Sequence, residues 1–182
     1  MQIDECIKSR RSVRKYSDQE INNEVLSEIV DLARFSPSWK NTQVVRYHVV
    51  KNPDTKEKIA QNCVLGFEFN AKTVVRCNAL VIVSVVTGIS GYEKDGSYST
   101  SQEDRWEMFD AGIANQTVCL AAHSKGVGSV ILGVFDENKI RQYISLPENE
   151  RVTNLIALGY PLEQAKSAPP RKEVSELLDI IE

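Results

Sequence analysis

The chain has 182 residues, of which 42% are hydrophobic and 26% charged, and its formal net charge is −3. These values are typical of one soluble globular domain, which we expect to span residues 1–182. The mildly negative charge argues against a dedicated nucleic-acid binder, and the sequence lacks the run of about 18 apolar residues that a membrane-spanning helix needs.

The N-terminus and the cysteines point to the same compartment. The first ten residues, MQIDECIKSR, carry acidic side chains and no apolar stretch, so we do not expect a secretory signal. The four cysteines are too far apart to form a C-x-x-C pair, at Cys6, Cys63, Cys77 and Cys119. We therefore expect free, buried thiols in a cytoplasmic protein, with no structural metal site.

Apolar periodicity and turn residues predict a chain of mixed helices and strands. The expected helices cover 2–9, 22–36, 54–62, 102–125 and 136–146, with a short one in the tail after 161. The expected strands cover 44–50, 79–86, 128–135 and 153–160. Residues 79–86 are almost wholly apolar, which is typical of a strand buried on both faces. A loop rich in Gly and Ser covers 87–101, and the pattern as a whole favours an α+β or α/β fold.

A basic stretch, KSRRSVRKY at 8–16, places five cations within the eight residues from Lys8 to Lys15. Nucleic acid, a solvated helix end and one small, highly charged ligand are three explanations for it. Arg10, Arg11 and Arg14 offer forked donors, and Ser12 adds a hydroxyl, which together suit a phosphate monoester. Spacing alone leaves all three explanations open.

Motifs for other chemistry are missing from the sequence. There is no P-loop, no G-x-S-x-G and no H-E-x-x-H, and the GVG at 126–128 ends a helix instead of opening one. We interpret the two histidines, His48 in a strand and His123 near the end of the longest helix, as structural. A protein without a nucleophile, base or metal site either performs no chemistry or uses a cofactor.

Several motifs together resemble those of the nitroreductase family. In chain order they are RRSVRKY (10–16), SPSWKNTQ (36–43), GVGSVILGVF (126–135), LGYP (158–161) and PPRK (169–172). The resemblance covers essentially the whole chain. It implies an α+β fold with a central, mostly antiparallel sheet flanked by helices. It also implies an intertwined homodimer with FMN sites at the interface, and NAD(P)H as the hydride donor.

The resemblance also implies a set of cofactor-binding residues on four segments. The FMN phosphate and ribityl end would be held by Arg10, Arg11 and Ser12. Arg171, with its neighbour Lys172, would approach the same phosphate from the C-terminal segment. Arg14 would reach the pyrimidine edge of the flavin. The partner subunit would contribute Pro37, Ser38, Trp39, Asn41 and Gln43. The segment beside the ring would be Ile131, Leu132 and Gly133.

The implied activity needs no catalytic side chain, because the flavin carries the chemistry and Arg14 only tunes it. The expected reaction passes hydride from NAD(P)H through flavin N5 to a nitroaromatic, a quinone or a similar small-molecule acceptor. Dehalogenation, heterocycle oxidation, breakdown of flavin and flavin binding without turnover stay open as alternatives. Where the family often has Gln-Pro-Trp, this chain has Gln43-Val44-Val45, so it lacks that aromatic residue.

The longest predicted helix bears on assembly. Small residues alternate there with large apolar ones, at Ala111, Gly112, Ala114, Ala121 and Ala122. Small side chains allow close approach of another helix, so the pattern suits a dimer interface. A core helix within one subunit explains the pattern almost as well, and the resemblance of SPSWKNTQ is what favours the dimer.

Overall fold

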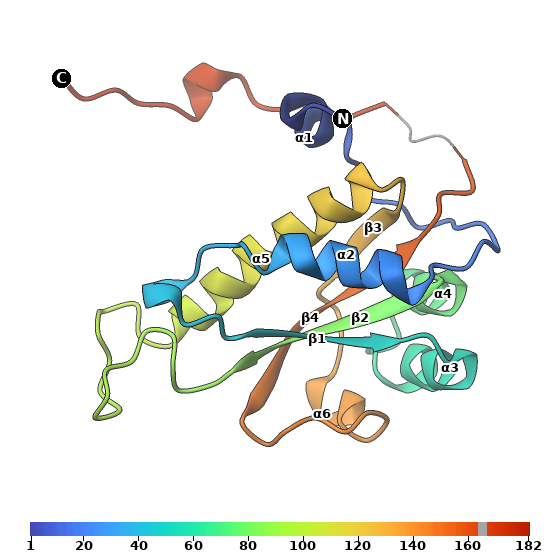
Figure 1. Cartoon of the computed structure of the whole chain (residues 1–182), viewed down its shortest axis with the longest axis horizontal. Helices are drawn as coiled ribbons and strands as arrows, with labels where there is room; N and C mark the ends of the chain where they lie inside the picture. Colours follow the sequence, from blue (N-terminus) through green and yellow to red (C-terminus); the bar gives the residue numbers. More distant parts are fainter. Residues whose placement is uncertain (164–166) are drawn as a thin grey trace.

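A single antiparallel sheet organises the chain in the computed structural model, which describes residues 1–163 and 167–182 (Figure 1). Its four strands follow the order β1-β2-β4-β3. They are β1 (Val45–Val50), β2 (Ala79–Val86), β3 (Gly128–Leu132) and β4 (Glu150–Gly159). The strands β1 and β3 therefore form the two edges of the sheet. The predicted α+β class and the antiparallel sheet are confirmed.

Helices cover both faces of this sheet. One face packs against α2 (Asn23–Ala33) and α5 (Arg105–Ser124), and the other against α3 (Pro53–Asn62), α4 (Glu68–Arg76) and α6 (Glu137–Ile140) (Figure 1). The remaining elements are α1 (Ile3–Ser9) and the 3-10 turns η1 (Trp39–Asn41) and η2 (Val174–Glu176). No helix in the described residues is long and apolar enough to cross a bilayer.

The central strand β2 shows how the sequence produces these layers. Successive side chains on a strand point to opposite faces. Leu80 and Ile82 accordingly pack toward α3, α4 and α6, whereas Val81 and Val83 pack toward α2 and α5. All four are buried, so the apolar run is a strand covered on both faces, as predicted.

The small residues of α5 are divided between two surfaces. Four alanines are buried within the subunit, at Ala111, Ala114, Ala121 and Ala122. Gly112 is exposed, on a surface where Met108 and Phe109 are 49% and 58% exposed. The alanines therefore pack inside the subunit, and any contact of α5 with another chain involves the other side of the helix.

Several predicted boundaries are wrong. The helix α4 was not predicted, since its N-cap residue, Phe67, provides no side-chain hydrogen bond that would mark a helix start. The helix α5 begins at Arg105 and not at 102, because Glu103 has a left-handed φ of 55°. The strand β3 stops at Leu132, α2 ends at Ala33 before Pro37 is reached, and α6 has only four residues. The tail forms a 3-10 turn in place of a terminal α-helix.

The basic segment is held along the β3 edge. Ser12 forms a parallel bridge with Ser129, and the Val13 amide donates to the Ser129 carbonyl at 2.9 Å. Tyr16 is buried, and its hydroxyl donates to the Val13 carbonyl at 2.6 Å. The apolar residues of the segment thus face the protein.

Two glycines make this contact possible. A Cβ at Gly128 would lie 2.7 Å from the Cβ of Val13, and one at Gly159 would lie 2.4 Å from Cδ1 of Tyr16. Both distances are too short for real carbon atoms. The glycines of the GVG and LGYP motifs are therefore needed to seat the basic segment on the sheet.

We predict that Gly159→Ala lowers the free energy of unfolding by about 1–3 kcal/mol, the usual cost of overpacking. The new methyl group would collide with Tyr16 and with Oδ1 of Asn78, at 2.4 and 2.5 Å. Denaturant unfolding measures the effect. Gly133→Ala is the control, since no described residue other than its chain neighbours has an atom within 4 Å of the Cβ position. Equal stability of the two variants would contradict the proposed close packing.

Candidate functional site

Cations from two distant parts of the sequence meet in one cavity of about 530 Å³. It is lined by Arg10, Arg11, Ser12, Val13, Arg14, Lys15, Glu163, Ser167, Pro169 and Arg171. We call Arg10, Arg11, Ser12, Arg14 and Arg171 the arginine cradle. The volume falls in the range of about 300–1,000 Å³ that is usual for small-molecule sites. The structure therefore brings Arg171 to the basic stretch, while Lys172 is exposed and is not among the lining residues.

Hydrogen bonding in the cradle is incomplete. Nη1 of Arg11 donates to the carbonyls of Lys8 and Arg10, at 2.6 and 2.8 Å. Its Nε is buried and has no hydrogen-bond partner among the described residues. Lys15 pairs with Glu163 at 3.1 Å, but within 1–163 and 167–182 no carboxylate forms an ion pair with a cradle arginine. The cradle thus offers free donors to an anion.

His123 lies behind the cradle at the end of α5. Its Nε2 is 2.8 Å from the Ser9 hydroxyl, which itself donates to the Glu5 carbonyl. Burial lowers the pKa of His123, and the positive charges of Arg10 and Arg11 lower it further, against a smaller opposite effect of Glu5. The imidazole is therefore held neutral beside the arginines and serves as a structural hydrogen-bonding group.

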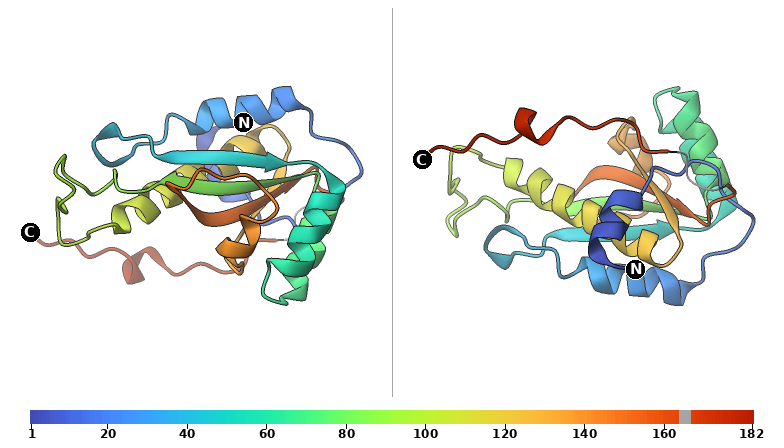
Figure 2. Two further views of the ribbon diagram at one scale, coloured as in Figure 1. Left: turned by 90° about the horizontal axis from the view of Figure 1, so that it is seen from below. Right: turned by 90° about the horizontal axis from the view of Figure 1, so that it is seen from above.

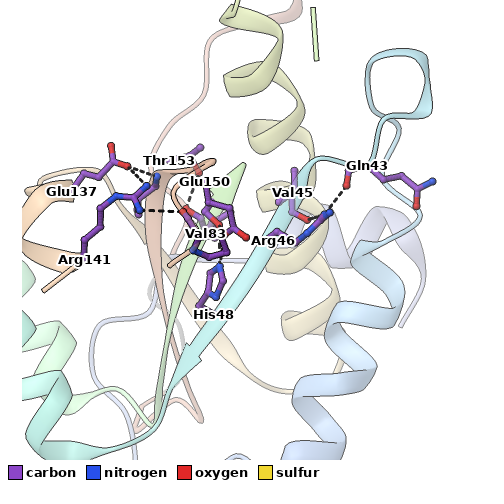
Figure 3. Close-up of polar contacts among 12 residues, drawn as sticks. Gln43, Val45, Arg46, His48, Val83, Glu137, Arg141, Glu150 and Thr153 are labelled. Carbon is purple, nitrogen blue, oxygen red and sulfur yellow. Dashed lines mark hydrogen bonds and ion pairs between the residues drawn. The ribbon is translucent and has the colours of Figure 1, made fainter. Parts of the chain in front are cut away.

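A second group of predicted residues lies elsewhere, on the turn formed by residues 37–43. Pro37, Ser38 and Gln43 line a cavity of about 370 Å³ together with Asp110 and residues of α2 and β1. The Gln43 amide donates to the Ser38 hydroxyl at 2.9 Å, and Arg46 donates to the Gln43 carbonyl at 2.8 Å (Figure 3). Asn41 is exposed on the same turn.

Trp39 joins this turn to α5. Its backbone amide donates to Asp110, and its ring lies against that of Trp106, with the centroids 4.4 Å apart. The ring nitrogen of Trp39 is buried and has no hydrogen-bond partner among the described residues. The side chain is thus packed against its own subunit.

The two groups lie at opposite edges of the sheet. The cradle follows β3, whereas the 37–43 turn leads directly into β1. Three strand spacings separate these edges, which amounts to about 14 Å. The sequence predictions therefore fall on two separate places of one chain.

The third group lies where β3 ends. Ile131 is 46% exposed and Gly133 is exposed, both on the same sheet edge as the cradle. Leu132 is 3% exposed, because its side chain packs into the core with Leu155 and Ile140. Only the backbone of Leu132 can therefore contact a ligand at this edge.

A polar cluster formed by His48, Ser84 and Glu150 resembles a hydrolytic triad but lacks its geometry. Nε2 of His48 lies 2.7 Å from the Glu150 carboxylate and 3.1 Å from the Ser84 hydroxyl (Figure 3). A triad uses the two different ring nitrogens for the acid and the hydroxyl. Here one nitrogen contacts both, and Ser84 is fully buried. This cluster joins β1, β2 and β4, and it accounts for the polar start of β4 at Glu150.

Comparison with known proteins places this geometry in a family. A family profile described as Nitroreductase family matches residues 7–160. The chain belongs to the nitroreductase family. The family prediction made from the motifs is confirmed.

Individual members of the nitroreductase family resemble the chain along most of its length. A candidate NADH dehydrogenase/NAD(P)H nitroreductase of Methanothermobacter thermautotrophicus is 35% identical over 167 residues, covering 90% of this chain and 79% of that protein. A nitroreductase family protein from Clostridium novyi NT has a TM-score of 0.77 at 27% identity, covering 92% of this chain and 90% of that one. A Desulfovibrio desulfuricans protein solved in complex with FMN shares the fold, with a TM-score of 0.75 at 23% identity, covering 98% and 95%.

Two residues that contact the candidate site of this nitroreductase-family chain were not predicted from the sequence. Asp110 and Trp106 both lie on α5, and both contact Trp39. An acidic residue surrounded by Phe, Ala and Ile in a helix was a signal for Asp110, since such a residue is buried only when its oxygens are satisfied. Trp106 gave no signal of its own, because its partner is 67 positions earlier in the chain.

We predict that His123 makes stability depend on pH. The pKa of His123 is lower in the folded protein than in the unfolded chain. As the pH drops, the unfolded chain therefore takes up this proton at a higher pH than the folded protein does. The free energy of unfolding then falls below pH ~6.5, the ordinary pKa of histidine. Denaturant unfolding from pH 8 to about pH 5 should show His123→Gln losing part of this dependence. The difference in stability between the two proteins should be constant above pH ~6.5 and shift in favour of the variant below it. A constant difference over the whole range would contradict the assignment.

Proposed function

We propose that this chain is an FMN-dependent oxidoreductase that uses NAD(P)H, formed as a single domain over residues 1–182. The observation that carries the proposal is the arginine cradle of a nitroreductase-family chain, in which the Nε of Arg11 is buried and has no hydrogen-bond partner in the described part of the chain. The FMN complex of the Desulfovibrio desulfuricans neighbour and the NAD(P)H in the name of the Methanothermobacter relative support it.

The donor set of the cradle fits a phosphate monoester. Such a group carries a charge of about −1.5 to −2 near neutral pH and three acceptor oxygens. Arg10, Arg11 and Arg171 present planar forks, and Ser12 presents a hydroxyl, at the wall of one cavity. The missing partner of Arg11 Nε would be supplied by a phosphate or ribityl oxygen. These four residues would therefore hold the polar end of FMN.

Arg14 has a different role in this proposal. FMN, when bound, would supply the chemistry that transfers hydride from NAD(P)H to an acceptor. Arg14 lines the cavity and is exposed, so its guanidinium can lie along the edge of the flavin ring. A fixed cation there stabilises the negative charge that reduction adds, and it therefore favours the reduced state. No protein side chain is proposed as a nucleophile or base.

We further propose a homodimer in which each flavin site uses both chains. The cradle and the 37–43 turn lie at opposite sheet edges of one chain, so the turn that completes a site would come from the partner. The C-terminal arm, residues 167–182, supports this arrangement, since it runs away from the sheet past α1 (Figures 1 and 2). Its apolar residues are 57–91% exposed, at Val174, Leu177, Leu178, Ile180 and Ile181. A second subunit would bury them.

The acceptor is proposed only as a class: a nitroaromatic, a quinone or a similar small, electron-poor molecule. Its place is beside Trp106 and Phe109 at the start of α5, where a cavity of about 330 Å³ is also lined by Gln102 and Arg105. The rings of Trp106 and Phe109 pack edge to face, with their centroids 5.3 Å apart. Such rings provide an apolar surface for a flat molecule.

We predict that the purified protein binds FMN and that NADH or NADPH bleaches the flavin absorption without oxygen. A nitroaromatic or quinone should restore it. Stopped-flow absorbance under anaerobic conditions measures both half-reactions. Bound flavin that neither nucleotide reduces would indicate a binding protein without turnover, and a protein that binds no flavin would overturn the proposal.

The shared site can be tested by complementation. One chain carries Arg11→Ala and Arg171→Ala, and the other carries Asn41→Ala and Gln43→Ala. Each lost charged hydrogen bond is worth about 1.5–3 kcal/mol, which is roughly 10- to 100-fold in FMN affinity. Each mutant homodimer has two damaged sites, whereas a heterodimer has one doubly damaged and one intact site. We expect FMN binding to return at half occupancy after subunit exchange, and verified heterodimers without any binding would exclude the shared site.

A further inference from the structure

We infer that Asp110 is a positioning residue, which holds the 37–43 turn of one subunit in the flavin site of its partner. The inference rests on the proposed function, because the turn has a ligand to meet only if the shared FMN site exists. The geometry of the hold itself belongs to a single chain and can be measured without any flavin.

Asp110 is a buried carboxylate whose hydrogen bonds all lead out of its own helix. It is 1% exposed, on the second turn of α5. The Trp39 amide donates to both of its oxygens, at 3.0 and 3.2 Å, and the Ser90 hydroxyl donates to Oδ2 at 2.7 Å. Hydrogen bonds to a charged acceptor are the strong ones, and a buried carboxylate that loses them is costly. Asp110 therefore ties the turn to α5.

The turn needs such a hold because its backbone is strained. Lys40, Asn41 and Gln43 have left-handed φ values of 45°, 56° and 51°. Left-handed backbone costs about 1–2 kcal/mol for a residue with a side chain, although Asn tolerates it better. Within the turn, three hydrogen bonds oppose this strain: the Gln43 amide donates to the Ser38 hydroxyl, and the amides of residues 41 and 42 donate to the carbonyls of residues 38 and 39. The contacts with α5 supply the rest, and they fix where Asn41 and Gln43 point.

The same carboxylate also ties down the loop at 87–101. Ser90, which lies in this loop, donates its hydroxyl to Asp110. A second contact joins the turn to the loop, because Lys40 pairs with Glu93 at 2.9 Å. Glu93 in turn accepts from Ser99 at 2.5 Å. Turn and loop are therefore joined to each other and to α5, and both would reach the partner's flavin as one unit.

The tryptophans provide a direct measure of the hold. The chain has only two, Trp39 and Trp106, and their ring centroids are 4.4 Å apart at an angle of 41°. Two indoles this close and tilted couple in circular dichroism, and the resulting couplet disappears when they separate. The couplet therefore reports whether the turn is seated on α5, in the protein without FMN.

The first experiment compares three variants of the full chain by circular dichroism and FMN titration. Asp110→Leu fills a similar volume but accepts no hydrogen bond, so we expect the couplet to be lost and FMN affinity to fall about 10- to 100-fold. Asp110→Asn keeps an acceptor oxygen and should retain the couplet. Glu107→Gln is the matched control, since Glu107 is also 1% exposed, on the same helix, but binds Gly88 and Arg151.

The outcomes separate positioning from general loosening. A couplet retained in Asp110→Leu overturns the inference, and so does a couplet lost equally in Glu107→Gln. If Asp110→Leu does not fold, the same comparison is made with Asp110→Ala, which also removes both acceptor oxygens of the Trp39 amide. A wild-type protein with the couplet but without FMN binding would refute the proposed function and leave the hold intact.

The second experiment tests on which site Asp110 acts. An Asp110→Leu chain should restore half occupancy of FMN with the Arg11→Ala, Arg171→Ala chain, because the heterodimer then has one intact site. It should restore nothing with the Asn41→Ala, Gln43→Ala chain, because both sites then lack a seated turn. The reverse pattern would place Asp110 in the site of its own cradle and overturn the inference, as would failure with both partners in verified heterodimers.

Discussion

The packing of the basic segment on the edge of the sheet is the contact on which the rest of the structure depends. Val13 and Tyr16 lie where Gly128 and Gly159 leave room, and the Tyr16 hydroxyl donates to backbone carbonyls of the segment and of β4. Burial raises the pKa of Tyr16, so the hydroxyl stays protonated and remains a donor. With its apolar residues facing the sheet, the segment can only direct its guanidinium groups outward, into one cavity.

Collecting like charges in one cavity is unfavourable for folding, and the structure offsets this locally. Lys15 is paired with Glu163, and His123 is kept neutral by burial and by the arginines beside it. The arginines themselves keep their charge and their free donors. In the proposed site, a dianionic phosphate would reduce this repulsion and would accept a hydrogen bond from the Nε of Arg11, which has no partner among the residues that the structure describes.

The helix α5 connects the two halves of the proposed site. It carries Asp110 at the 37–43 turn and His123 at the cradle, a distance of about 20 Å along the helix axis. Its alanines let it lie close to the sheet, and so one rigid element sets the positions of both halves within a chain. The halves face different edges, and this geometry is the physical reason for proposing that two chains are needed.

Local patterns in the sequence determined the element types, the family and the residues that gather in the cradle. The apolar run of β2, the start of α2 near Asn22 and the helix end at Gly126 are local signals, and the sequence predicted each of them. The helix α4 and the first residues of β4 were missed, because Phe67 gives no capping signal and the buried Glu150 is satisfied by the distant His48 and Ser84. Only the tertiary structure decided that the cradle and the turn lie on opposite edges, and that Asp110 holds the turn. Strand order and contacts between residues 71 positions apart are set by packing across the sheet, which no local pattern records.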